Sequence, residues 1–94
     1  MAKNRFEQVD EPQEDAVTLS LWKEGEEAHG SVNIPASASN GRLASDSTSG
    51  SLAVKDAFRS AIRIANEIKA AVVVVDPDGL WQAEWGDLYR PREN

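Results

Sequence analysis

The sequence predicts an α+β fold in which one amphipathic helix packs on one face of an antiparallel sheet. Apolar residues recur at three- and four-residue spacing over residues 52–69, which is the spacing of one helix face. Short stretches of alternating or β-branched apolar residues stand before and after this segment and are typical of strands. With 94 residues the chain has the size of one small domain. We therefore expect the order β-β-(long loop)-α-β-β over residues 16–89.

Both ends of the chain are expected to lie outside this domain. Residues 1–15 hold five acids and two bases, with Phe6 and Val9 as isolated apolar residues. That composition buries too little apolar surface to offset the entropy of ordering it. We expect a disordered acidic tail over residues 1–15 and a frayed tail over residues 90–94. No apolar segment of signal-peptide type follows the first charges, so a cytoplasmic protein is expected.

Two strands are predicted between residues 16 and 34. Val17, Leu19 and Leu21 alternate with polar residues, which predicts a strand with one buried face. Residues 23–30 are charged and contain two glycines, and they predict a turn. Residues 31–34 alternate again and end at Pro35, which cannot donate to a ladder. The serine-rich stretch over residues 35–50 then predicts a long flexible loop.

The segment from Leu52 to Lys69 carries the strongest periodic signal of the chain. No glycine or proline interrupts it, and Ser51 stands where a side chain can cap the first free amides. The residues of the apolar face are Val54, Ala57, Phe58, Ala61, Ile62, Ala65 and Ile68. The opposite face carries a ladder of bases at four-residue spacing, formed by Lys55, Arg59 and Arg63.

The last strands are predicted as a hairpin over residues 71–85. Four valines precede Asp76-Pro77-Asp78-Gly79, and an apolar segment from Leu80 to Trp85 follows. Such a turn between two strand-like segments is typical of a β-hairpin. In the register of a glycine-bulge turn, Val73, Val75, Trp81 and Trp85 face the helix, whereas Val72 and Val74 face away from it. A shift of one residue would exchange the two faces.

The sequence holds few groups that carry catalysis or bind metal. It has no cysteine and one histidine, and it lacks the glycine-rich phosphate-binding motifs. His29 beside Glu26 and Glu27 is compatible with a proton-transfer pair, but its charged, glycine-flanked surroundings favour a solvated histidine. The aspartates of residues 76–79 fit a turn better than a cation site. We expect no catalytic residue, no metal, no cofactor and no small-molecule ligand.

An apolar patch is the main candidate for a binding surface. If the sheet is covered by a single helix, its second face is open. Trp22, Val72, Val74 and Leu80 are then expected on that face. Exposed apolar patches of this kind are typical of protein contacts, and a symmetric homodimer is the commonest way to cover one.

The sequence therefore predicts a non-enzymatic domain that binds itself or another protein. The alternative is a nucleic-acid accessory protein that uses Lys55, Arg59 and Arg63. Against this alternative, the net charge is −6, and only residues 51–70 hold more bases than acids. The longest apolar run, residues 70–75, is far shorter than the roughly 20 residues that cross a bilayer, so no membrane contact is expected.

Overall fold

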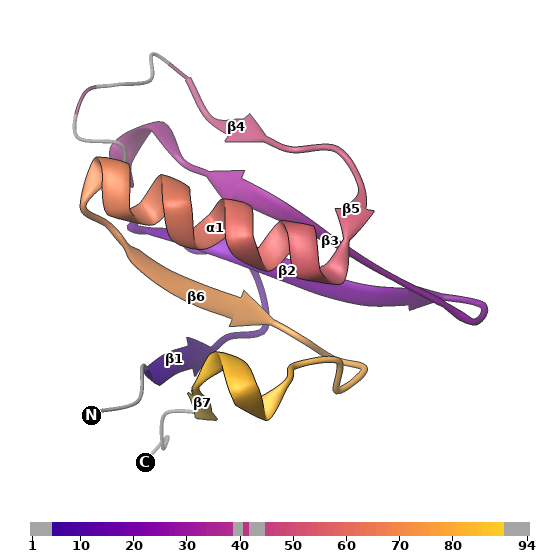
Figure 1. Cartoon of the computed structure of the whole chain (residues 1–94). Helices are drawn as coiled ribbons and strands as arrows, with labels where there is room; N and C mark the ends of the chain where they lie inside the picture. Colours follow the sequence, from indigo (N-terminus) through magenta and orange to yellow (C-terminus); the bar gives the residue numbers. More distant parts are fainter. Residues whose placement is uncertain (1–4, 39–40, 42–44, 90–94) are drawn as a thin grey trace.

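A single mixed sheet forms the centre of the computed structural model (Figure 1), which describes residues 5–38, 41 and 45–89. The strands are β1 (Arg5–Gln8), β2 (Ala16–Glu24), β3 (Glu27–Ile34), β4 (Ser47–Thr48), β5 (Leu52–Ala53), β6 (Ala71–Val75) and β7 (Asp87–Tyr89). Their order is β4-β3-β2-β6-β1-β7, and β5 pairs with β3. One helix, α1 (Val54–Ile68), packs on one face. The predicted α+β class and single domain are confirmed, although the sheet is mixed and not antiparallel.

The first two predicted strands form the long hairpin β2–β3. Their register pairs Thr18 with Asn33 at one end and Glu24 with Glu27 at the other. The turn is limited to Gly25 and Glu26, and Gly25 has a φ of 62°, as the first central position of a type II′ turn requires. The turn predicted over residues 23–30 is therefore too long, because β3 begins at Glu27.

Small residues let α1 approach the sheet closely. Ala57 and Ala61 are fully buried, and a Cβ added at Gly30 of β3 would lie 2.7 Å from the Cβ of Ala57. The predicted apolar face of the helix is confirmed. The predicted cap is wrong, because the N-cap position is Ala53, which makes no side-chain cap hydrogen bond. Since Leu52 and Ala53 pair with β3 as strand β5, Ser51 stands before a strand and not before the helix.

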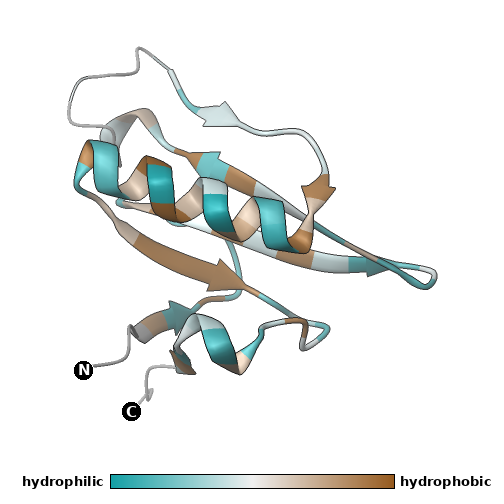
Figure 2. Cartoon of the chain, in the orientation of Figure 1, coloured by the Kyte–Doolittle hydropathy of each residue, from teal (hydrophilic) through white to brown (hydrophobic). Residues whose placement is uncertain are grey.

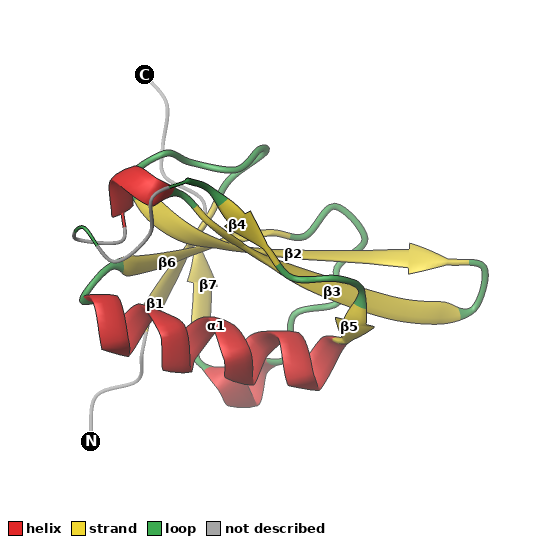
Figure 3. Cartoon of the chain, turned by 90° about the horizontal axis from the view of Figure 1, so that it is seen from above, coloured by secondary structure: helices red, strands yellow, loops and turns green. Residues whose placement is uncertain are grey.

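The hairpin predicted over residues 71–85 is absent. β6 runs parallel to β2, with Val17 paired to Val72 and Leu19 to Val74, and β1 pairs along its other edge. With both edges of β6 occupied, residues 80–85 cannot join it. The short 3₁₀ helix η2 (Ala83–Trp85) forms instead, on the same side of the sheet as α1 (Figure 3).

Residues 5–8 are a strand and not the start of a disordered tail. β1 lies between β6 and β7 and is parallel to both. Phe6 is buried, with its ring 6.1 Å from that of Phe58 and 5.1 Å from that of Trp81. The burial of one large aromatic residue and the backbone pairing with β6 and β7 thus order this segment, although most of its residues are polar.

Residues 9–15 connect β1 to β2 by crossing over β6 on the face opposite α1. The amide of Gln13 donates to the hydroxyl of Thr18, which points away from the helix and is fully buried. Val73 pairs with Thr18 and is also buried. This half of the second face is therefore covered by the chain itself.

The segment predicted as a flexible loop is ordered over part of its length. η1 (Ala36–Ala38) and β4 lie within it, and the amide of Val32 donates to the hydroxyl of Ser49. Residues 39–40 and 42–44 of this predicted loop and the predicted tail over residues 90–94 lie outside the described residues. In the described part of the chain, no helix has the length and apolar character needed to cross a membrane.

Candidate functional site: the groove between α1 and η2

An open groove of about 560 Å³ runs along the outer side of α1, where η2 lies beside the helix. Its lining residues are Phe58, Arg59, Ile62, Arg63 and Asn66 from α1, and Glu84 and Trp85 from η2. The α1 residues share the flank that turns away from β3. The two walls therefore come from two elements that are far apart in the sequence. The helix α1 is predicted by its own periodicity, whereas the position of η2 depends on tertiary contacts.

The groove has an aromatic floor. The rings of Phe58 and Trp85 are stacked, with centroids 4.4 Å apart and planes 6° from parallel. Trp81 stands edge-on to both, and Phe6 of β1 lies behind Trp81. The four rings thus pack in the stacked and edge-to-face geometries that aromatic pairs prefer, and Phe58 and Trp85 form the apolar base of the groove.

The placement of this aromatic cluster depends on Asp76. Its side chain accepts hydrogen bonds of 2.8 Å from the amides of both Leu80 and Trp81. The indole of Trp81 donates to the carbonyl of Gly86. These bonds turn the chain back toward α1 directly after β6, and so carry Trp85 over Phe58.

The rim of the groove is polar and mainly cationic. Arg59 and Arg63 are exposed on successive turns of α1, and Asn66 follows one turn later. Glu84 supplies the only carboxylate of the lining. Within residues 5–38, 41 and 45–89, neither guanidinium forms an ion pair, so both are available to an anionic group from outside.

Only part of the predicted ladder of bases therefore lies in the groove. Lys55, Arg59 and Arg63 are all exposed on α1, but only the two arginines line the groove. The prediction missed the aromatic floor, because it assigned Trp85 to a strand beneath the helix. The one signal that could have indicated the floor is Phe58, which lies at the margin of the apolar face of the helix.

The predicted apolar patch on the open sheet face is not formed. Val74 is fully buried on the side of α1, and Val72 and Leu80 pack against the same core. The parallel register with β2 decides this, because Val72 and Val74 take the side of Val17 and Leu19. Of the four predicted residues, only Trp22 lies on the face away from α1.

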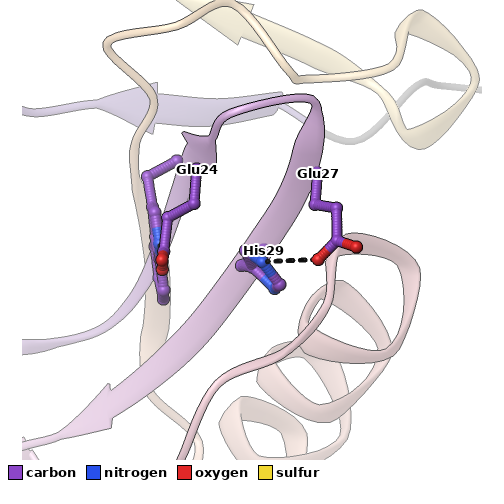
Figure 4. Close-up of polar contacts among 4 residues, drawn as sticks. Glu24, Glu27 and His29 are labelled. Carbon is purple, nitrogen blue, oxygen red and sulfur yellow. Dashed lines mark hydrogen bonds and ion pairs between the residues drawn. The ribbon is translucent and has the colours of Figure 1, made fainter.

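Trp22 belongs to a polar cluster near the tip of the β2–β3 hairpin. Its indole donates to Glu24 at 3.0 Å, and its ring lies 6.0 Å from that of His29. His29 in turn lies 3.6 Å from a carboxylate oxygen of Glu27 (Figure 4). His29 is a strand residue with a side chain 25% exposed, and not the solvated loop residue that was predicted.

No metal-binding cluster of three or more His, Asp or Glu side chains is found among the described residues. Comparison with protein-family models, with curated proteins and with solved structures found no match. The functional interpretation therefore depends on the geometry of the groove.

Proposed function

We propose that this chain is a protein-interaction domain that acts by binding and docks its partner in the groove between α1 and η2. The observation that supports this is the combination of a stacked aromatic floor with two arginines that have no ion-pair partner among the described residues. Aromatic residues and arginine are the side chains most enriched where protein interfaces concentrate their binding energy.

The side chains of the groove favour a partner segment that is both apolar and acidic. Phe58, Ile62 and Trp85 offer apolar surface, which favours a segment with an aliphatic or aromatic contact. Arg59 and Arg63 offer two planar cationic groups about one helical turn apart, which favours carboxylates. An acidic protein segment with apolar contacts matches both features.

The nucleic-acid alternative has less support from this arrangement. Lys55 lies outside the groove, and Glu84 faces the arginines from the other wall. The net charge of −6 further opposes a polyanion. Within the groove, the cationic residues are therefore only Arg59 and Arg63, and one carboxylate lines the same groove.

Site-specific photo-crosslinking in the cells that produce the protein tests the proposal. A photoreactive amino acid replaces the exposed Glu84 at the rim of the groove, and in a parallel variant it replaces the exposed Ser47 of β4. We expect discrete protein adducts from position 84 and not from position 47. We also expect Arg59→Glu with Arg63→Glu to remove the adducts, because the double change places carboxylates where the partner's acids dock.

The matched control changes Lys55→Glu with Lys69→Glu, which alters the net charge equally at exposed positions outside the groove. Adducts that persist in this control and vanish in the arginine variant support the proposal. Equal adducts at positions 84 and 47, or adducts indifferent to the arginine changes, would refute it. Adducts to nucleic acid in place of protein would favour the alternative.

A further inference from the structure

We infer that the groove is occupied by the tip of the β2–β3 hairpin from a second copy of the same chain. This inference rests on the proposed function, since it names the occupant of that groove. The segment concerned is residues 23–27, Lys23-Glu24-Gly25-Glu26-Glu27, which we call the acidic tip. It is the part of the described chain that combines strong negative charge with an exposed, protruding position.

The acidic tip extends beyond the body of the domain. The last residue of β6 paired with β2 is Val75, opposite Ser20, and β5 pairs with β3 only at His29 and Gly30. Beyond these contacts the two strands pair only with each other, and the Lys23 amide donates one hydrogen bond to the side chain of Asp78. Figures 1 and 3 show the hairpin projecting past the first turn of α1. A two-residue turn closes the end and keeps it narrow.

Little within its own molecule neutralises the acidic tip. All five of its residues are exposed, and the Glu27 side chain is 82% exposed. Glu24 accepts a hydrogen bond from Trp22, and Glu27 lies beside His29. Glu26 makes no hydrogen bond or ion pair with another described residue. Three carboxylates and one lysine therefore lie at the exposed end of the hairpin, which Figure 2 shows as mainly hydrophilic.

The acidic tip and the groove are complementary in charge. The groove presents two arginines, Arg59 and Arg63, against one carboxylate, Glu84, and both arginines lie on α1. The acidic tip presents Glu26 and Glu27, held by a short turn. Both partners are ordered before they meet, which lowers the entropic cost of docking, and the paired charges raise the rate of encounter.

Reciprocal exchange makes this contact a closed dimer. A tip that enters the groove of a neighbour without receiving one in return would produce an open chain of molecules. When each copy both gives its tip and receives that of its partner, the two contacts are related by a two-fold axis. Two copies of a modest contact then act together, and the assembly ends at two chains.

Sedimentation equilibrium of the full chain at low and high salt tests the inference. We expect a dimer at about 0.05 M salt that dissociates at about 0.5 M, over which the Debye length falls about threefold. Glu26→Lys with Glu27→Lys, and separately Arg59→Glu with Arg63→Glu, should each raise the dissociation constant by about a hundredfold, because each change sets like charges opposite one another. All four changes together should restore the dimer.

Two charge-matched variants serve as controls. Glu11→Lys with Glu14→Lys matches the reversal at the tip, and Lys55→Glu with Lys69→Glu matches the reversal at the groove. The four control positions and the four positions of the two reversals are all exposed, and circular dichroism checks that each variant is folded. A monomer at low salt, a dimer that survives either reversal, or a fourfold variant that stays monomeric while folded would each overturn the inference.

The two proposals can fail separately. If position 84 captures a different protein while the purified chain is monomeric, the groove docks a partner and the second-copy inference is wrong. If position 84 captures no protein and the chain is monomeric, the proposed function fails as well. A dimer that is insensitive to salt and to both reversals would place self-association on another surface.

Discussion

At the residue scale, Asp76 is a buried acidic residue with a structural role. It is 5% exposed, and its carboxylate satisfies two amides of the following turn. Its carbonyl also accepts a hydrogen bond from the side chain of Gln8 at 3.2 Å. One aspartate therefore joins β1, the end of β6 and the aromatic segment that builds the groove.

Replacing Asp76 with alanine should destabilise the domain by about 2–4 kcal/mol, because the amides of Leu80 and Trp81 lose their acceptor in a partly buried place. Urea unfolding followed by tryptophan fluorescence measures the change. Asp78→Ala is the control. That side chain is exposed and accepts one bond from the amide of Lys23, so its loss should cost less than about 1 kcal/mol. Equal costs for the two variants would contradict the role given to Asp76.

At the scale of elements, β1 supports both the sheet and the groove. It separates β6 from β7 and pairs with each. Its one apolar side chain in the core, Phe6, stands behind Trp81 and beside Phe58. The floor of the groove therefore depends on a strand that contributes no residue to its lining.

Changing Phe6→Ala should cost about 3–5 kcal/mol, the usual range for loss of a buried phenylalanine. Thermal unfolding by circular dichroism measures it, and tryptophan emission should shift to the red as Trp81 gains solvent. The control Glu11→Ala, at an exposed position in the crossover, should stay within about 0.5 kcal/mol of the parent. A Phe6→Ala protein of parental stability would show that residues 5–8 behave as the dispensable tail that composition predicts.

At the scale of the whole molecule, the register of the central strands decides which surface is available to a partner. The parallel pairing of β6 with β2 turns Val74 into the core beneath α1. The far face carries Trp22 beside serines and His29, and the crossover lies over the part of this face where Thr18 and Val73 are buried. The face that sequence periodicity indicated as a binding surface is thus mostly polar or covered, and the groove takes its place as the candidate.

Two lysine substitutions at positions predicted for one patch should therefore behave differently. Val74→Lys buries an unpaired charge at a cost of several kcal/mol, a large part of the about 5–15 kcal/mol that holds a domain together. We expect an unfolded or aggregated protein by circular dichroism and gel filtration. Trp22→Lys lies beside Glu24 and should remain folded. A folded Val74→Lys protein would indicate that Val74 lies at the surface, and it would refute the parallel register of β6 with β2.

Local patterns predicted much of the fold. The helix over residues 54–68 and the strand β2 were predicted because their buried faces repeat with a period set by the backbone of a single element. Lys55, Arg59 and Arg63 were predicted on the exposed face of the helix by the same reasoning, and all three are exposed. The aspartate–proline–aspartate–glycine turn was placed correctly, but the element after it was not, because turn chemistry does not determine which strand occupies the neighbouring edge.

The sequence by itself determined the α+β class, the amphipathic helix, the β2 strand and the acidic charge, since each depends on composition or on residues within one element. Only the tertiary structure decided that residues 5–8 are a strand, that β6 is parallel to its neighbours, and that Trp85 covers Phe58. The reason is that these features depend on pairings between residues up to 82 positions apart, such as Phe6 with Leu88. The free energy of those pairings is shared among several elements, so the periodicity within one segment does not predict them.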